Sequence, residues 1–214
     1  MTVAMGALAS SAAWAQEGRF EISGTAGWTF SDGVSGNTIT VPGVGAFNRI
    51  DPKDSFAWGA RLGFMATENV EVGFLFNQQS SSLELGGSTT ATLGDESIYN
   101  YHGYFAYNFG DEHAKARPYI LGGAGATQFG AVTTGLASGR TIGGHTEFSS
   151  TWALGVKMYP GKNVGIRLEA RWTPTYIKSD ATGWWCDPYW GCYLVGNAQY
   201  ANQFDLNGGI VLRF

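Results

Sequence analysis

The sequence predicts an all-β protein, an eight-stranded antiparallel up-and-down transmembrane β-barrel. Three observations lead to this fold class. Apolar and polar residues alternate with a period of two over long stretches, and short and long connections between these stretches alternate. No segment reaches the roughly 18 consecutive apolar residues of a membrane-spanning helix. With 214 residues, 14% of them aromatic and 14% charged, the chain is long enough for one domain and has no composition of a disordered protein.

The N-terminal segment has the pattern of a secretory signal peptide. It is apolar and rich in small residues, and it ends in Ala13-Trp14-Ala15, an A-x-A cleavage pattern. We therefore expect residues 1–15 to be removed and residues 16–214 to form the barrel. No Lys or Arg precedes the apolar run, so we expect a start codon upstream or a truncated start. The alternative is a short helix packed on the domain.

Eight segments carry the alternation, and we expect each to form one strand: Arg19–Phe30, Ser55–Phe64, Val70–Asn77, Tyr99–Phe109, Pro118–Phe129, Glu147–Met158, Val164–Tyr176 and Gln203–Phe214. Roughly 9 to 11 residues suffice for a tilted strand to cross a bilayer.

One face of each of seven strands is apolar. In the first three strands this face comprises Phe20, Ile22, Gly24, Ala26, Trp28 and Phe30; Phe56, Trp58, Ala60, Leu62 and Phe64; and Val70, Val72, Phe74 and Phe76. Leu75 breaks the pattern of the third. The fourth has Tyr99, Tyr101, Phe105, Tyr107 and Phe109, whereas the fifth is too rich in glycine for its faces to be assigned. The last three have Phe148, Trp152, Leu154, Val156 and Met158; Val164, Ile166, Leu168, Trp172 and Tyr176; and Phe204, Leu206, Ile210, Leu212 and Phe214.

The charges of the seven assigned strands all lie on the opposite face. Besides Arg19, Glu21, Glu71 and Arg213, they include a predicted lumenal charge network of Arg61, Glu147, Lys157, Arg167, Glu169, Arg171 and Asp205. A soluble sandwich would point its apolar face inward. Aromatic residues at the ends of the apolar face and balanced charges on the other favour a membrane barrel with a polar interior.

Connection lengths support the membrane barrel. Residues 66–69, 110–116 and 160–163 form short connections, whereas those at 31–54, 79–94, 130–145 and 178–199 are long. This alternation is typical of short periplasmic turns and long external loops.

The chain resembles bacterial outer-membrane β-barrels of the small OmpA-like and OmpX-like group. The resemblance covers Gly18 to Phe214 and includes the segments "RPYILGGAG" and "NVGIRLEARW". Its sharpest element is the C-terminal "FDLNGGIVLRF". The resemblance implies that the final aromatic residue, Phe214, is read as a signal by the outer-membrane assembly machinery, and that the protein resides in the bacterial outer membrane.

An eight-stranded barrel is just wide enough for its own side chains to fill it. We therefore expect paired charges in the lumen, a structural or surface-interaction role and no enzymatic activity. One alternative is small-solute passage. Another is a lipid A-modifying enzyme, because lipid A deacylases are similar in size and use Ser, His and an acid. His102 lies in a strand, His113 in a short turn and His145 in a loop near Glu147 and Ser149, and no serine lies two residues after His102.

The segment "GWWCDPYWGC" holds both cysteines, Cys186 and Cys192. Five residues separate them, so neither CxxC redox chemistry nor a zinc knuckle fits, and we predict a disulfide in an oxidising compartment. The resulting loop would present Trp184, Trp185, Tyr189, Trp190 and Tyr193 as a candidate external binding surface. The alternative is that these rings cap the barrel or anchor it in the membrane interface.

Composition also limits the partners. A net charge of −4 without a Lys/Arg cluster excludes a nucleic-acid partner. The spacing of three histidines and two cysteines predicts no metal site, and we expect no cofactor. The expected partners are outer-membrane lipid, lipopolysaccharide, the assembly machinery and an extracellular ligand of the loops, and we expect a monomer.

Overall fold

A computed structural model describes residues 20–41, 45–111, 113–133, 141–177, 186–187, 191–192 and 199–214. The strands are β1 (Phe20–Asp32), β2 (Val34–Val41), β3 (Gly45–Pro52), β4 (Ser55–Met65), β5 (Val70–Gly87), β6 (Thr90–Asn108), β7 (Ala116–Phe129), β8 (Val132–Thr133), β9 (Thr141–Ile142), β10 (His145–Met158), β11 (Val164–Ile177), β12 (Cys186–Asp187), β13 (Gly191–Cys192) and β14 (Gln199–Arg213). No helix in this described part is long and apolar enough to span a membrane. The predicted signal peptide, residues 1–15, lies outside the described residues.

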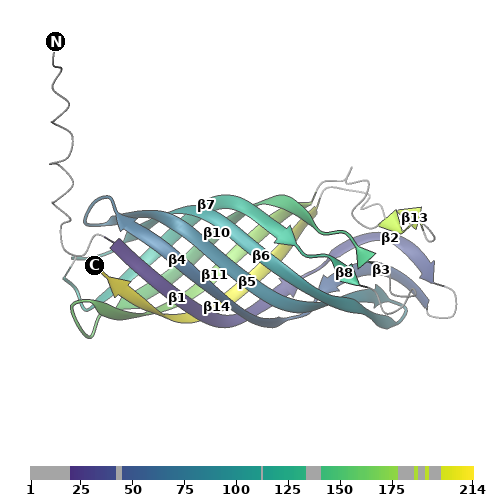
Figure 1. Cartoon of the computed structure of the whole chain (residues 1–214), viewed down its shortest axis with the longest axis horizontal. Coiled ribbons are helices and arrows are strands. Elements are labelled where there is room, and N and C mark those ends of the chain that lie inside the picture. Colours follow the sequence, from purple (N-terminus) through teal and green to yellow (C-terminus); the bar gives the residue numbers. More distant parts are fainter. Residues whose placement is uncertain are drawn as a thin grey trace, which may run out of the picture.

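Eight long strands close into an antiparallel barrel (Figure 1). The neighbours around the barrel are β4, β1, β14, β11, β10, β7, β6 and β5, and the pairing of β5 with β4 completes the circle. Every strand therefore has a partner on both sides, which leaves no open edge in the wall. The predicted eight-stranded antiparallel barrel is confirmed.

The first and last strands form the seam of the barrel. Glu21 to Asp32 of β1 lie opposite Arg213 to Asn202 of β14 in continuous register. The backbone N–H of Phe214 donates to the carbonyl of Phe20 at 2.9 Å, and the N–H of Phe20 donates to the carbonyl of Phe214 at 3.2 Å. The C-terminal residue thus extends the hydrogen-bonded ladder that closes the barrel.

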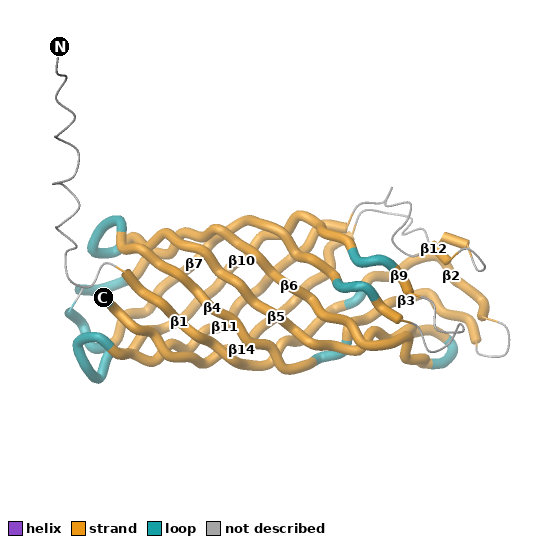
Figure 2. Tube along the Cα trace, viewed as in Figure 1, coloured by secondary structure: helices purple, strands orange, loops and turns teal. Residues whose placement is uncertain are grey.

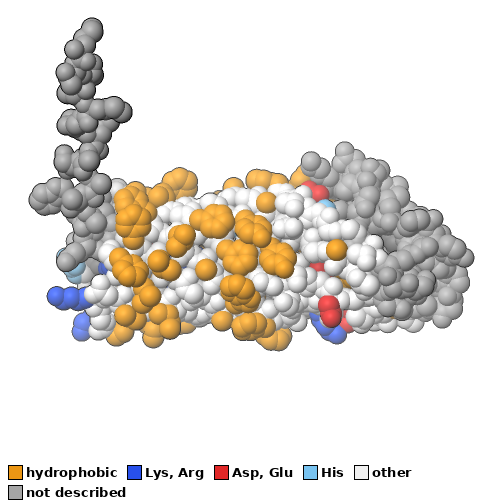
Figure 3. Space-filling model, in the orientation of Figure 1, with side chains coloured by type: hydrophobic (Ala, Val, Ile, Leu, Met, Phe, Trp, Pro, Cys, Tyr) orange, Lys and Arg blue, Asp and Glu red, His pale blue; other side chains and the backbone are white. Residues whose placement is uncertain are grey.

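The strands turn their apolar side chains outward. On β1, Phe20, Ile22 and Trp28 are about half exposed, whereas Glu21, Ser23 and Thr29 are buried in the lumen. Figure 3 shows the exposed apolar side chains gathered over the barrel wall. Aromatic pairs join neighbouring strands on this surface, for example Trp172 and Phe204, which stack at 6.2 Å. The wall therefore has the apolar exterior that a lipid-facing barrel requires.

The two ends of the barrel differ. Short connections join β4 to β5, β6 to β7 and β10 to β11 at the end that holds Phe214, which we call the turn end (Figures 1 and 2). At the other end the β2–β3 hairpin pairs with the prolonged part of β5, and β5 stays paired with β6 as far as Gly86 and Thr90. We call β2, β3 and these prolonged parts of β5 and β6 the extension.

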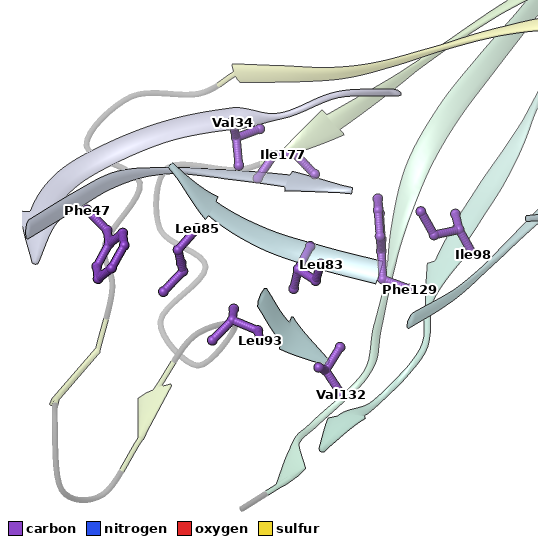
Figure 4. Close-up of a cluster of buried hydrophobic side chains, with 9 residues drawn as sticks. All are labelled: Val34, Phe47, Leu83, Leu85, Leu93, Ile98, Phe129, Val132 and Ile177. Atoms are coloured by element: carbon purple, nitrogen blue, oxygen red, sulfur yellow. The ribbon is translucent and has the colours of Figure 1, made fainter. Parts of the chain in front are cut away.

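The extension corrects two expectations about the connections. Residues 31–54 and 79–94 were predicted as loops, but most of them form strands. The reason is a second apolar core at this end, the apolar cluster (Figure 4), which comprises Val34, Phe47, Leu83, Leu85, Leu93, Ile98, Phe129, Val132 and Ile177. Burial of these side chains stabilises the strands. The polar and glycine-rich composition of the two segments had indicated loops instead.

Candidate functional site

The inward face of the barrel positions the candidate site. Successive side chains of a strand point to opposite faces, so alternate residues of all eight long strands line the lumen. Most of the buried charged side chains on this face gather in the half nearer the turn end. They are Glu21, Arg61, Glu71, Arg117, Lys157, Arg167, Glu169, Arg171 and Asp205, joined by the nearly buried Arg213, and we call these ten residues the lumenal ion network.

Lys157 is the centre of the network near the turn end. Its Nζ lies 2.5 Å from Glu21 Oε2 and 2.5 Å from Glu71 Oε2, so one ammonium group joins two buried carboxylates. Arg167 Nη2 lies 3.6 Å from Glu21 and 3.8 Å from Glu71. Arg213 Nη2 donates to Glu21 Oε1 at 3.0 Å. Strands β1, β5, β10, β11 and β14 are thereby tied together across the lumen.

A second part of the network lies further from the turn end. Arg61 of β4 donates through Nη2 to Glu169 Oε1 of β11. Arg171 Nε donates to Asp205 Oδ2 at 2.9 Å, and Thr29 Oγ1 donates to the other oxygen of Asp205. Buried charges are tolerated when they are paired and hydrogen-bonded in this way.

Tyrosines complete the coordination of the carboxylates. Their hydroxyls donate as follows: Tyr104 to Glu71 at 2.6 Å, Tyr119 to Glu169 at 2.6 Å and Tyr159 to Glu21 at 2.7 Å. Glycines leave space for two of these rings, because a Cβ at Gly155 would lie 2.5 Å from the Tyr119 ring and one at Gly73 2.8 Å from the Tyr104 ring. The lumen is thus filled by side chains.

Six of the seven charges predicted for the lumen belong to this network. Glu147 does not, because it lies opposite Thr127 toward the extension, at the other end of β10 from Lys157. Arg117 was missed because the faces of β7 were not assigned. Its spacing of two residues from Tyr119 is the signal that could have placed it inside.

His102 and Ser149 form a hydrogen-bonded pair in the lumen. His102 Nε2 lies 2.9 Å from Ser149 Oγ, and Thr127 Oγ1 lies 2.9 Å from the same serine oxygen. Sequence spacing did not predict this pair. Both side chains are buried, and His102 Nδ1 has no hydrogen-bond partner among the described residues. In the described part of the lumen no acid contacts the imidazole to orient it, as catalytic triads require.

Neutral polar side chains separate the ion network from the extension. Gln203 Nε2 donates to Gln79 Oε1 at 2.7 Å, and Asn100 Nδ2 donates to Gln203 Oε1 at 3.1 Å. Gln79 Nε2 lies 3.0 Å from each of the Ser31 and Ser55 hydroxyls. These bonds connect β1, β4, β5, β6 and β14 by groups that carry no charge.

Glu96 is a buried carboxyl group in the extension. It lies on the inward face of β6, opposite Ser81 and two residues from Ile98 of the apolar cluster. The side chain is 6% exposed, and Oε2 has no hydrogen-bond partner in the described part of the chain. Burial raises the pKa of Glu96 to about 8, because the ionised form loses its hydration there. No sequence pattern marks Glu96 as a buried residue.

The cysteine-containing segment is described only in part. The backbones of Cys186 and Cys192 lie directly opposite each other in the β12–β13 ladder. Facing positions of an antiparallel ladder lie within the Cα separation that a disulfide spans. The cysteine side chains and the residues Trp184, Trp185, Tyr189, Trp190 and Tyr193 lie outside the described residues, so the disulfide and the aromatic surface stay predictions. No group of three His, Cys, Asp or Glu side chains within the described ranges is placed to hold a metal ion.

Comparison with known proteins identifies the architecture. The family model "Outer membrane protein beta-barrel domain" matches residues 1–214. Neisserial surface protein A is 15% identical, with 91% of this chain and 97% of that chain covered and a TM-score of 0.55. The outer membrane protein OprG from Pseudomonas aeruginosa is 14% identical, with coverages of 92% and 97% and a TM-score of 0.60. A comparison with curated proteins found no match.

The family match agrees with the apolar wall and the closed ladder. The expected resemblance and the location in the bacterial outer membrane are confirmed. At these identities the solved structures indicate the fold alone. The chain belongs to the family of outer-membrane proteins with a β-barrel domain.

Proposed function

We propose that this protein has a structural and surface-interaction role in the outer membrane and that the extension is its interaction surface. The observation that carries this proposal is the contrast between the two parts of the molecule. The lumen is filled by a bonded ion network, whereas the extension has an apolar core of its own. A segment that only connected strands would not need such a core.

The filled lumen supports a role other than open solute passage. Lys157 bridges Glu21 and Glu71, and Arg61 contacts Glu169, across the interior. Separation of buried pairs is strongly unfavourable. We expect reconstituted protein in a planar bilayer to give no stable conductance steps. Reproducible steps would instead support the alternative of small-solute passage.

The outward face of the extension offers polar groups to a partner. Arg49 pairs with Asp32 and Asp51 at 2.7 Å, and Lys53 pairs with Glu84 at 2.6 Å. A polar groove of about 610 Å³ lies beside the second pair. Its lining includes the outward-facing Ser80, Ser82, Asp95 and Ser97 together with Lys53 and Tyr99, and it reaches the inward-facing Ser81 and Glu96. Hydroxyls, paired charges and an aromatic ring suit recognition of polar ligands such as saccharides.

Charge reversal in the extension tests this role. Cells that express the double variant Arg49→Glu, Lys53→Glu are expected to attach less to immobilised glycans than cells with the unmodified protein. The matched control is Lys162→Glu, which reverses an exposed charge in a short connection at the turn end. Equal attachment by all three strains would remove the extension as the interaction surface.

We also infer a non-enzymatic role. The buried His102–Ser149 pair with an unpartnered Nδ1 in the described lumen supports this inference. The test is the mass spectrum of lipid A from cells that express the protein or its Ser149→Ala variant. A lipid A change that depends on Ser149 would favour the lipid-modifying alternative.

The predicted partners complete the proposal. The exposed apolar wall supports contact with outer-membrane lipid and lipopolysaccharide. Phe214 is proposed as the signal for the assembly machinery, and its place at the barrel seam suits that role. We further propose a monomer whose predicted disulfide loop, Cys186 to Cys192, adds its aromatic residues to the interaction surface.

A further inference from the structure

The lumenal ion network carries more positive than negative charge. Its cations are Arg61, Arg117, Lys157, Arg167, Arg171 and Arg213, and its carboxylates are Glu21, Glu71, Glu169 and Asp205. Arginine does not lose its proton in proteins. Lys157 Nζ lies 2.5 Å from two carboxylate oxygens, one of Glu21 and one of Glu71. The five arginines alone outnumber the four carboxylates, so loss of the Lys157 proton would still leave an excess of positive charge.

Several guanidinium N–H groups in this network have no acceptor among the described residues. They are Nε and Nη1 of Arg61, Nε of Arg117, Nε and Nη1 of Arg167, and Nη2 of Arg171. All of these atoms are buried. Buried donors are nearly always hydrogen-bonded in folded proteins, and an unpaired charged donor is especially costly. The unbonded donors thus belong to the groups that carry the excess charge.

The carboxylates of the network are already engaged by other donors. Glu169 accepts from Arg61 and from Tyr119, one at each oxygen. Both oxygens of Asp205 likewise accept hydrogen bonds, from Thr29 and from Arg171 Nε. Glu21 and Glu71 each bond to Lys157 through one oxygen and to a tyrosine through the other. None of these oxygens accepts a hydrogen bond from the extra guanidinium donors in the described part of the chain, so these donors need a further acceptor.

Three of these arginines lie near one another. Arg167, Glu169 and Arg171 are alternate inward residues of β11, and Arg61 bonds to the Glu169 carboxylate that lies between the other two arginines in the strand. Arg61 therefore repels the Arg167 guanidinium. The Arg167 guanidinium lies 5.4 Å from the centre of the Tyr119 ring, which provides no full negative charge. Two like charges thus meet in a region of low dielectric constant, where repulsion is strong.

We propose that the lumen binds a chloride ion between the guanidinium groups of Arg61 and Arg167, with Arg171 as a neighbouring donor. Chloride supplies the missing negative charge and accepts hydrogen bonds from several directions. A monatomic anion also suits the enclosed position of the donors better than an oxyanion, which needs more space. This site is independent of the interaction role proposed for the extension.

Thermal stability at matched ionic strength tests the site. Replacement of sodium chloride by sodium gluconate is expected to lower the midpoint of heat unfolding by about 5 °C. The variant Arg167→Met should abolish this difference between the two salts. Arg49→Met, which removes an arginine of the outward-facing pairs of the extension, should retain it. Equal midpoints in both salts, or an undiminished difference in Arg167→Met, would overturn the proposal.

Crystallography of the unmodified protein provides a second test that does not depend on the folding of a variant. Crystals grown in sodium bromide are expected to give an anomalous difference peak between the Arg61 and Arg167 guanidinium groups at the bromine absorption edge. A clear lumen with only water density beside these groups would refute the chloride site.

Discussion

Replacement of Glu96 by glutamine tests the energetic consequence of a buried carboxyl group in the extension. Its pKa is raised from 4.5 to about 8 by burial, and Oε2 has no hydrogen-bond partner among the described residues. The folded state therefore binds this proton more tightly than the unfolded state. The contribution of Glu96 to stability is most favourable below pH 4.5, declines as the pH rises toward 8, and is constant above that value.

The magnitude follows from the two pKa values. Over the roughly 2.5 pH units between 4.5 and about pH 7, the Glu96 carboxyl group ionises in the unfolded chain but stays protonated in the folded protein. This difference in ionisation favours the unfolded state by about 3 kcal/mol at about pH 7. Glu96→Gln keeps the size of the side chain and removes its ionisation. We expect the variant to match the unmodified protein at about pH 4 and to be more stable by about 3 kcal/mol at about pH 7.

The assay is urea unfolding in detergent micelles, followed by tryptophan fluorescence across this pH range. Glu84→Gln is the control, because it removes a carboxylate of the same extension that pairs with Lys53 on the outward face. The control isolates the effect of burial from that of one lost charge. If the stabilities of Glu96→Gln and the unmodified protein followed parallel pH profiles, the carboxyl group of Glu96 would not be buried in the folded protein as described.

Three further predictions address the wall, the network and the loop. The folded protein should migrate differently from the boiled protein in SDS gels, because the closed ladder resists detergent; identical mobility would count against the barrel. Lys157→Met leaves the Glu21 and Glu71 carboxylates without their shared cation and should lower the free energy of unfolding in urea by about 3 to 5 kcal/mol, with partial recovery on adding Glu71→Gln. Non-reducing peptide mapping of folded protein from outer-membrane fractions should detect a Cys186–Cys192 disulfide, and free thiols at both positions would exclude it.

The sequence predicted the faces of the strands well because each strand obeys a local rule. Period two assigned Arg61 and Glu169 to the lumen without knowledge of the barrel. It did not assign them to each other. They are 108 residues apart in the chain, and their contact depends on how far the strands are staggered when the sheet closes. The same applies to His102 and Ser149, which no sequence spacing related.

Leu75, the one residue that broke the alternation of the third predicted strand, marks an apolar region inside the barrel. It interrupts the apolar outward face of the third predicted strand, and in the structure it is buried inside the barrel. There it packs in a small apolar layer with Tyr104, Ala106, Tyr119, Leu121 and Ala153. The lumen is therefore not uniformly polar. Apolar side chains fill part of the lumen, although the sequence pattern predicted a polar interior.

The extension was not predicted because the apolar face of β5 changes sides along the strand. Apolar side chains point outward in the barrel wall and inward in the extension. In the barrel wall, β5 turns Phe74 and Phe76 outward and Asn77 inward. Beyond Gln79 the inward residues are Ser81, Leu83 and Leu85, whereas Ser80, Ser82 and Glu84 occupy the outward face.

Alternate residues of β5 continue to point inward across this reversal. What changes is the medium that the outward face contacts. Lipid favours apolar side chains outside, and water favours them inside. The reversal on β5 therefore lies where the apolar outer wall of the barrel gives way to the polar outer face of the extension. The polar composition of residues 79–94 indicated exposure to water, but in the structure it belongs to strands with their own core.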